Sequence, residues 1–413
     1  MSMFSFFVGS LALACGNRAI PAHDSPPGVA LIGVASIPAD AVDLSGLEAP
    51  IPETKIPQNR AGALGSGLDY TGSKNLYYAL SDRGPNDGAA GFISRFQTVS
   101  ITADAKTSKL SVKLEHTTLF SDEKGNRYSG LASNFDAANP AQSRRLDTEG
   151  IRVSRTGSVF TSDEYGPWID EWTAGGVHLR RIELPAKFYV AHSSEKSADE
   201  LPPNNVSGRQ SNRGMEGLAR SPDGKRLYGV LQSPLIQDGG LDEKNKRVGT
   251  NIRVLELELA SGATREFLLP LEDPANGVNE ILAVDTNTLL VIERDSTAGT
   301  ASAFKRVYKL ELGAASDISA IAKLPAKGIP PGVVPLKKTL LIDFLDARFG
   351  LAGDSCPEKI EGLTFGPDLA DGRHLLLVSI DNDFKPEVPN SFWAFAVNRE
   401  LLPGFQPPQF DAH

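Results

Sequence analysis

One short pattern recurs along the chain, and it constrains the fold more than any other feature of the sequence. The pattern is a Glu or Ser, an apolar stretch, a polar turn, a second apolar stretch, and a polar or acidic end. Copies of it begin at Gly65, Thr148, Met215, Asn279 and Ile360. Periodic β units with no helices between them predict a β-propeller, in which each unit contributes one blade of a ring.

The copy at Met215–Leu235 shows why these units are expected to form strands. Pro222-Asp223-Gly224 has the composition of a tight turn, because Pro presets one φ angle and Gly accepts a positive one. The stretch from Leu227 to Leu231 is apolar on both faces, as expected for a strand packed inside a stack of sheets. A flat β-sandwich is the main alternative, but it gives no reason for one pattern to recur.

The number of blades is left open by the length of the chain. The copies lie about 60 to 90 residues apart, which is more than a compact four-stranded blade needs. We therefore expect an all-β propeller of about six blades, with five to seven compatible with the length. Insertions between blades are expected at 123–145, 192–213 and 237–250. Val29–Val34 and Phe392–Val397 would pair to close the ring, which leaves no open sheet edge.

The N-terminal segment resembles an export signal. Met3–Ala14 is an apolar run that is too short to span a bilayer, and Cys15 follows it. We interpret 1–14 as a signal peptide, 15–27 as a linker and 28–413 as a single propeller domain. In a lipoprotein-type signal, Cys15 would be the lipidated residue, whereas the alternatives are a plain cleaved signal peptide or a buried N-terminal strand. We expect a periplasmic or extracellular protein, with the outer membrane reached only through such an anchor.

The composition of the chain argues against some classes of partner and of catalytic site. The net charge is −9 and no segment gathers Lys and Arg, which argues against nucleic acid as a partner. No Gly-x-Ser-x-Gly motif occurs, and the six His residues show no zinc-type spacing. An enzyme built from this chain must therefore rely on carboxylates, arginines and a metal. We expect a monomer that acts on a small molecule.

The recurring acids are the candidate functional residues. The innermost strand of each propeller blade faces a central channel, so that Glu149, Glu216, Glu280 and Glu361 would meet at one register. Gly150, Gly217 and Gly362 follow three of these acids and would let neighbouring backbones approach closely. Gathered carboxylates repel each other unless they take up protons, pair with cations or bind a metal. The alternative for any single Glu is a hydrogen bond to the backbone of the next blade.

We divide the candidate residues into three groups by expected role. The catalytic group is Glu149, Asp163, Glu164, Glu216 and Glu361. The substrate-binding group is Arg83, Arg213 and Arg294, whose planar guanidinium groups suit phosphate. The metal-binding group is Asp82, Glu280, Glu293, Asp381 and Asp383. Ca²⁺ is the expected metal because it prefers a site made entirely of oxygen ligands.

The five copies together resemble a known family. "SGLDY…YALSDRGP", "TEGIRV…FTSDEYGP", "NRGMEGLARSPDGKRLYGVLQSPL", "NEILAV…LLVIERDS" and "EGLTF…LLLVSIDNDF" are similar, in this order, to the bacterial "esterase-like activity of phytase" family. The resemblance runs from about Gly65 to Phe395. It implies an exported β-propeller, often a lipoprotein, whose recurring Glu and Asp residues form a hydrolytic site. Two positions depart from the pattern, since Ser66 replaces Glu and Ile281 replaces Gly, and those blades are expected to contribute less.

The expected activity is hydrolysis of a phosphate ester outside the cytoplasm with the help of a divalent cation. One alternative is a carboxyl-ester or lactone hydrolase on a calcium-binding propeller. A second alternative is a propeller without catalytic activity that binds glycan or protein at its surface, because a fold alone never settles a function.

Overall fold

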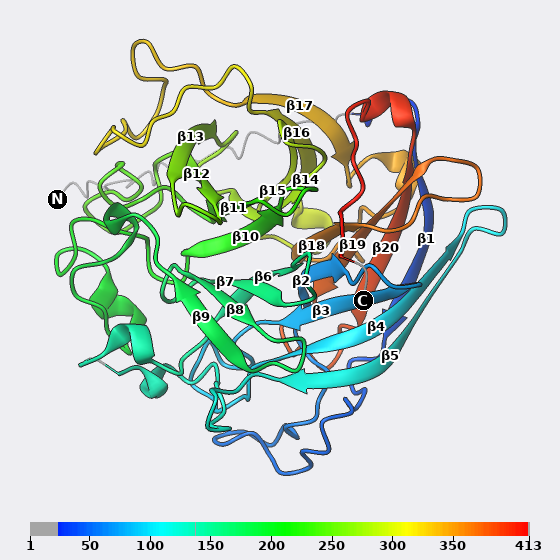
Figure 1. Ribbon diagram of the computed structural model, residues 1–413, viewed down its shortest axis with the longest axis horizontal. Coiled ribbons are helices and arrows are strands. Elements are labelled where there is room, and N and C mark those ends of the chain that lie inside the picture. The colour runs from blue at the N-terminus through cyan, green and yellow to red at the C-terminus, as the bar shows by residue number, and fades with distance from the viewer. Residues whose placement is uncertain (1–23, 137, 412–413) are drawn as a thin grey trace, which may run out of the picture.

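The chain folds into a ring of five four-stranded antiparallel sheets (Figure 1). We describe a computed structural model covering residues 24–136 and 138–411. The predicted signal peptide 1–14 and the predicted lipidation site Cys15 lie outside the described residues. Ser25, in the predicted linker, is buried, and its backbone N–H donates to Asp346 Oδ2 over 2.8 Å.

Each sheet is one blade, and each of the first four is a simple antiparallel meander. Blade 1 contains β2 (Leu64–Tyr70), β3 (Leu76–Ser81), β4 (Arg95–Asp104) and β5 (Lys109–Leu119). Blade 2 contains β6 (Thr148–Val153), β7 (Val159–Asp163), β8 (Ile169–Trp172) and β9 (His178–Ile182). Blade 3 contains β10 (Met215–Arg220), β11 (Arg226–Leu231), β12 (Asn251–Glu258) and β13 (Thr264–Pro270). Blade 4 contains β14 (Gly277–Ala283), β15 (Thr288–Arg294), β16 (Lys305–Glu311) and β17 (Lys337–Asp343).

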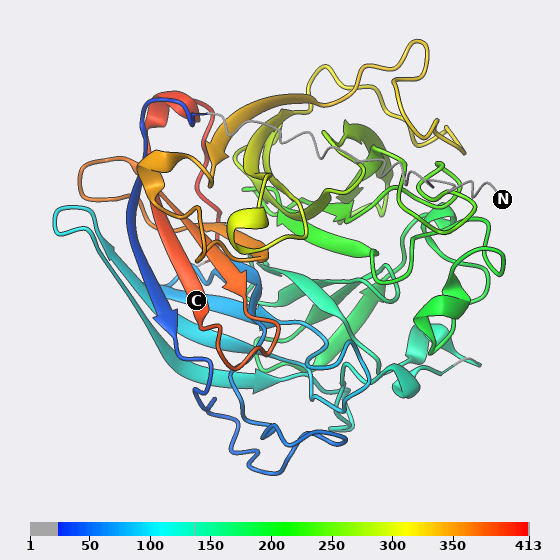
Figure 2. The ribbon, with the colours of Figure 1, turned by 180° about the vertical axis from the view of Figure 1, so that it is seen from behind.

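Blade 5 combines the two ends of the chain and closes the ring, as the sequence predicts. It contains β18 (Lys359–Phe365), β19 (His374–Asp381), β20 (Asn390–Val397) and, as its outermost strand, β1 (Val29–Ile37). Val29 pairs with Val397 and Val34 pairs with Trp393. The blue β1 strand runs beside the red β20 strand in both views (Figures 1 and 2). Hydrogen bonds between the two ends thus close the ring, and β1 covers the edge that β20 would otherwise expose.

The helical content of the described residues consists of short 3₁₀ turns in the connections. These are η1 (Ala132–Asn134), η2 (Pro140–Gln142), η3 (Ala186–Phe188), η4 (Ser197–Glu200), η5 (Gly299–Ala301), η6 (Ala347–Phe349) and η7 (Arg399–Leu401). None of the helices within the described part of the chain has the length and apolar character needed to cross a bilayer.

The hydrophobic core is divided into clusters that lie between adjacent blades. Phe96 of blade 1 and Trp172 of blade 2 share one cluster, for example, and Val307 of blade 4 and Phe395 of blade 5 share another. Strands packed on both faces must be apolar on both faces, which explains the run of buried residues along β11. Its turn also forms as expected, with Gly224 at φ +70°.

The ring has five blades rather than the six favoured from chain length, because the additional residues form connections. The predicted insertions 123–145 and 192–213 join successive blades, and their described residues form no strand. The predicted insertion 237–250 lies inside blade 3, between β11 and β12, and not between blades. A further long connection, which the sequence did not indicate, joins β16 to β17 within blade 4.

Candidate active site

The innermost strands β2, β6, β10, β14 and β18 surround the centre of the ring (Figure 1). Each of them contains a β-bulge, which is a residue inserted into the ladder that re-aims a side chain. In β10 the pairing skips Glu216, and in β18 it skips Glu361. In β6 the skipped pair is Glu149 and Gly150.

The glycine that follows the bulged acid allows the inner strands to pack together. A Cβ atom added to Gly217 would lie 2.8 Å from the Cα atom of Glu280 in the next blade. One added to Gly150 would lie 2.8 Å from the backbone nitrogen of Leu218. These distances are shorter than van der Waals contact, so only glycine fits at these positions. The predicted close approach of the backbones is therefore confirmed.

Blade 4 departs from the predicted register by one residue. The pairing of β14 skips Asn279, whereas Glu280 pairs with Ile292. Asn279 therefore takes the position of Glu216 in blade 3, and Glu280 takes the position of Gly217. The residues at the site register are Ser66, Glu149, Glu216, Asn279 and Glu361, one from each blade.

A cavity of about 170 Å³ lies over this register. Its acidic lining residues are Asp82, Glu149, Glu164, Glu216, Glu358 and Glu361. Its basic lining residues are Arg83, Arg213, Arg294 and Lys359. The closed ring thus brings together residues that lie up to 279 positions apart in the sequence, such as Asp82 and Glu361. All three arginines of the predicted substrate-binding group line this cavity.

Several side-chain oxygens of the site are buried and have no hydrogen-bond partner among the described residues. These atoms are Ser66 Oγ, Glu164 Oε1, Glu216 Oε2, Asn279 Oδ1 and Glu361 Oε2. The other oxygen of Glu216 accepts hydrogen bonds from Gln232 Nε2 and Asn279 Nδ2, both over 2.7 Å. Glu216 and Glu361 are thus each held through one oxygen and leave the other unpaired, and the carboxyl groups of Glu164 and Glu216 lie close enough to share a proton. An unpaired buried oxygen is costly unless a ligand or a proton satisfies it.

The carboxyl groups of the cavity hold protons more strongly than isolated carboxyls do. Burial raises the pKa of Glu149 well above its ordinary value, and repulsion from Glu216 adds to the effect. Burial likewise raises the pKa of Glu216 well above normal, with further contributions from Glu164 and Glu361. Burial also raises the pKa of Glu361, in spite of the nearby Lys359 and Arg294 cations. At neutral pH, protons or a cation must therefore neutralise part of this charge.

The three arginines differ in how far the protein itself neutralises them. Arg83 is paired with Asp147 over 2.8 Å and with Asp87 over 2.9 Å. Arg294 Nη2 contacts Glu361 Oε1 over 2.6 Å, but its buried Nε–H has no partner among the described residues. Arg213 donates to Gln232 Oε1 rather than to a carboxylate. Arg213 and Arg294 therefore retain donor capacity for an anion.

Three of the predicted metal-binding residues gather around a lysine. Ligand atoms of Asp82, Asp381 and Asp383 all lie within 4.8 Å of one another. Lys359 Nζ lies 2.9 Å from Asp381, 3.1 Å from Asp383 and 3.8 Å from Asp82. The charge of this cluster is already partly balanced by an ammonium group. A metal ion there would have to displace the lysine.

The remaining predicted residues point away from the cavity. Glu280 Oε1 accepts the N–H groups of Leu218 and Ile281, and its Oε2 lies 2.8 Å from Arg152. Glu293 is held by Lys338 over 2.6 Å. Asp163 accepts the N–H groups of Asp147 and Gly166 and fixes the turn that presents Glu164.

Two important residues were not identified from the sequence. Arg152 lies across the centre of the ring, where it donates to Leu68 O, Ile281 O and Leu363 O of three other blades. Asp147 lies close to Glu149 and Glu164, with ligand atoms within 4.8 Å of each other. A charged residue inside an apolar inner strand, and a second acid two positions before Glu149, were the available signals.

The donor set fits a hard divalent cation. The unpaired acceptor atoms named above are all oxygens of carboxylate, amide and hydroxyl groups, and Ca²⁺ prefers oxygen ligands. Asp147, Glu149 and Glu164 are buried and mutually close enough to share one ion. Asp147 of this group is paired with Arg83, whereas no ion pair of Glu149 or Glu164 is present among the described residues.

Comparison with known proteins gives one family match and one curated relative. The family model "Phytase-like: Esterase-like activity of phytase" matches residues 59–384. An "Uncharacterized secreted protein" of Arthroderma benhamiae is 27% identical over 351 residues, which are 68% of this chain and 66% of that protein. The match thus spans slightly less than two thirds of the relative's length.

Solved structures of low sequence identity also match. Regucalcin, a calcium-binding protein of Agrobacterium tumefaciens strain C58, has 12% identity and a TM-score of 0.37, with 92% of this chain and 98% of that chain covered. The calcium structure of a Trichoderma reesei carbohydrate-active enzyme of family AA12 has 13% identity and a TM-score of 0.37, with 91% and 97% covered.

Proposed function

Because the chain belongs to the phytase-like family, we propose that it is a hydrolase of phosphate esters that depends on a divalent cation, Ca²⁺ in the first place. The observation that carries this proposal is the set of unpaired, buried oxygens at the site register, with Arg213 and Arg294 beside them. Oxygens in this arrangement suit a cation, and the arginines suit the phosphate that would share it. The family description supports hydrolysis of an ester bond.

The metal would be held by the unpaired oxygens of Glu164, Asn279 and Glu361. Ca²⁺ held there would supply Lewis acidity, by polarising the phosphate and by lowering the pKa of a nearby water. It also reverses the negative local charge that would otherwise repel an anionic substrate.

The protein's own groups would perform the proton transfers. Glu149 and Glu216 are coupled carboxyls whose pKa values are both raised, so that one keeps a proton while the other is ionised. The ionised carboxylate accepts a proton from the attacking water, and the protonated carboxyl donates one to the leaving alcohol oxygen. The water oxygen bonds to phosphorus as the bond from phosphorus to the alcohol breaks. Arg213 and Arg294 donate hydrogen bonds to the phosphate oxygens.

We further propose that the protein acts outside the cytoplasm. The apolar segment before Cys15 supports export, as does the description of the curated relative as a secreted protein. Attachment to a membrane through Cys15 is part of the same proposal, and mass spectrometry of the mature N-terminus tests it.

Removal of the cation tests the metal requirement. Turnover of an aryl phosphate should stop when a chelator is added and return when Ca²⁺ is restored. Unchanged turnover in chelator would contradict the metal-dependent mechanism.

Substitution of the acids tests the location of the chemistry. Glu149→Gln and Glu216→Gln should each lower kcat by about 10²-fold or more, because a general acid–base group is lost. Glu280→Gln is the matched control, since Glu280 is an inner-strand acid that faces Arg152 instead of the cavity. Turnover of aryl acetates or lactones without turnover of phosphates would support the carboxyl-ester alternative. If no ester is turned over, the result would support the alternative of a propeller that binds a ligand without catalysis.

A further inference from the structure

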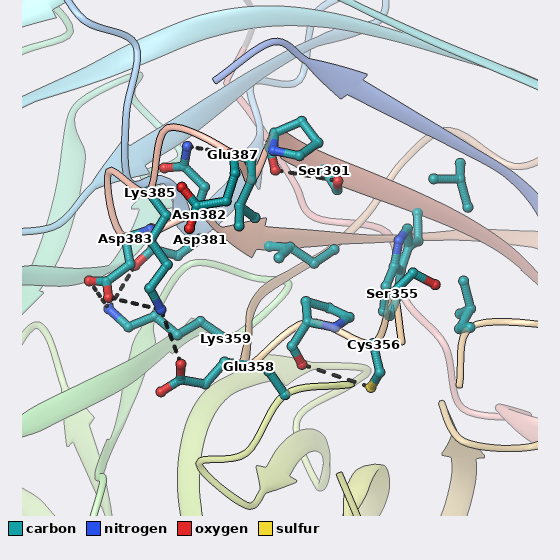
Figure 3. Close-up of a pocket in the computed structure, with 18 of the residues that line it drawn as sticks. Ser355, Cys356, Glu358, Lys359, Asp381, Asn382, Asp383, Lys385, Glu387 and Ser391 are labelled. Carbon is teal, nitrogen blue, oxygen red and sulfur yellow. Dashed lines mark hydrogen bonds and ion pairs between the residues drawn. The ribbon is translucent and has the colours of Figure 1, made fainter. Parts of the chain in front are cut away.

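A second, larger cavity opens beside the candidate active site, between blades 4 and 5. Its volume is about 660 Å³, compared with about 170 Å³ for the carboxylate cavity. The smaller cavity has room for a phosphate group and little else, whereas the larger one falls within the range of ligand pockets, about 300–1,000 Å³. Figure 3 shows this pocket between the segment of Ser355, Cys356 and Lys359 and the loop that carries Asp383, Lys385 and Glu387.

The two cavities adjoin each other at one side. Glu358 and Lys359 line both of them. The ammonium group of Lys359 lies at this junction, held by Asp381 and Asp383, as the dashed lines in Figure 3 show. A molecule whose reacting group occupies the carboxylate cavity would therefore extend past Lys359 into the larger pocket.

The lining of the larger pocket is apolar on one wall and acidic at its rim. The wall is formed by Val34, Leu351, Ile380 and Trp393, and half of the Val34 side chain is exposed there. The ionisable lining residues are Asp354, Glu358, Lys359, Asp381, Asp383, Lys385 and Glu387, that is, five acids and two bases. This balance disfavours a group with several negative charges, and the wall favours burial of an apolar group.

A third cavity adjoins the carboxylate cavity on another side and has a different chemistry. Its volume is about 410 Å³, and it shares Arg83 and Asn212 with the carboxylate cavity. Its ionisable lining residues include two arginines, Arg83 and Arg145, and three acids, Asp87, Glu195 and Glu200, so that its charge is less negative than that of the larger pocket. Ser197 lies at its exposed edge, as Ser355 does in the larger pocket.

We propose that the larger pocket binds the leaving group of the substrate, and that this group is an uncharged, apolar alcohol such as a fused-ring aryl alcohol. The proposal rests on the hydrolytic function proposed above and specifies its substrate class. The substrate is then a monoester that has one charged group and an apolar body. A cyclitol with several phosphates does not fit the pocket, because its additional charges would face the acidic rim. The alcohol leaves with the proton that the cavity carboxyl donates.

Kinetics with two substrates test the proposal in the Ca²⁺-loaded, full-length protein. Phenyl phosphate and 2-naphthyl phosphate release phenols of similar acidity but different apolar area. The wild-type protein should show a higher kcat/KM for the naphthyl ester. Ser355→Trp, which fills the pocket from an exposed position, should lower kcat/KM for the naphthyl ester about tenfold and leave the phenyl ester less affected. Ser197→Trp, the same change in the third cavity, should leave this preference unaltered.

Direct binding separates failure of this proposal from failure of the proposed function. Binding of 2-naphthol, measured by calorimetry, needs no turnover, and should be lost in Ser355→Trp and in Val34→Asp but kept in Ser197→Trp. Naphthol binding without any ester turnover would support the pocket and overturn the hydrolytic function. Turnover with no naphthol binding, or a preference altered by Ser197→Trp instead of Ser355→Trp, would overturn the pocket. Faster hydrolysis of inositol hexakisphosphate than of either aryl ester would also overturn it.

Discussion

Asn279 and Glu280 show how much a single residue of register decides. Side chains along a strand alternate between opposite faces, so a displacement by one residue moves a side chain from one environment to another. Asn279 lies at the bulge and faces the cavity, and its amide donates to Glu216. Glu280 faces the centre of the ring, where it contacts Arg152. The acid that best matches the repeat in sequence is therefore not the residue that joins the site.

Glu280 gives the first prediction, which concerns pH. Burial outweighs the Arg152 cation and raises the pKa of Glu280 to about 8. The folded protein therefore holds this proton in a pH range where the unfolded chain has lost it. Its contribution to stability is present at low pH and is lost as pH rises from the unfolded pKa of about 4.3 through the folded pKa.

Glu280→Gln should therefore flatten the pH dependence of unfolding. Between pH 5 and 8, the free energy of unfolding of the wild type should fall more steeply than that of the variant, by at most about 1.4 kcal/mol per pH unit. Urea unfolding at several pH values measures this slope. Glu243→Gln, at an exposed loop position, is the control and should follow the wild type. Equal slopes for Glu280→Gln and the wild type would contradict the assignment.

At the scale of elements, the inner strands are positioned by the residue after each bulge. Gly67, Gly150 and Gly217 each face the backbone of an adjacent inner strand at a distance that a side chain would not allow, and a Cβ atom added to Gly362 would lie 2.1 Å from Ser379 Oγ. The same bulge that re-aims the acid thus requires a glycine next to it. This coupling explains why Glu and Gly recur together in three copies.

Gly217→Ala should separate β10 from β14. The added Cβ would lie 2.8 Å from backbone atoms of Glu280 and Ile281, which cannot move aside without shifting the strand. We expect a loss of about 1–3 kcal/mol in the free energy of unfolding, as for other overpacked sites. Gly313→Ala is the matched control, because no atom lies within 4 Å of the position of its Cβ. A Gly217→Ala protein as stable as the control would show that the ring tolerates a wider spacing.

At the scale of the whole molecule, the ring is held together by β1. Val29, Ile32 and Ile37 of this strand are each 6% exposed, and β1 pairs along its length with β20. Without β1, the edge of β20 would be open and part of the core between blades would face water. The site would be affected as well, because the inner strands of blades 1 and 5 contribute Ser66 and Glu361 to it.

Removal of residues 1–37 should strongly destabilise the fold. Burial of three aliphatic side chains alone corresponds to about 5 kcal/mol or more. Thermal unfolding followed by circular dichroism should show a large decrease in Tm and a loss of cooperativity. Removal of residues 1–23 leaves β1 in place and serves as the control. A peptide with the sequence of Val29–Ile37 should restore stability by pairing with β20. A truncated protein that unfolds like the control would contradict the role of β1.

Much of this architecture was accessible from the sequence. Alternation of apolar residues, turn residues such as Pro222-Asp223-Gly224, and recurrence of one pattern predicted strands, blades and a closed ring, because these features depend on local periodicity. The clustering of Glu149, Glu164, Glu216 and Glu361 also followed from the repeat. The number of blades did not follow, because the length of the chain does not show how many residues lie in blades and how many lie in connections.

The sequence by itself determined that this chain forms repeated, tightly packed strands with acids and glycines in matched positions, since backbone propensity and side-chain alternation are local properties. Only the tertiary structure decided which oxygens meet in one cavity. A bulge in β14 places Asn279 rather than Glu280 at the site register. The ring also places Lys359 among Asp82, Asp381 and Asp383. Arg152 lies at the centre of the ring. These outcomes depend on distances between blades, and such distances are fixed only when the ring closes.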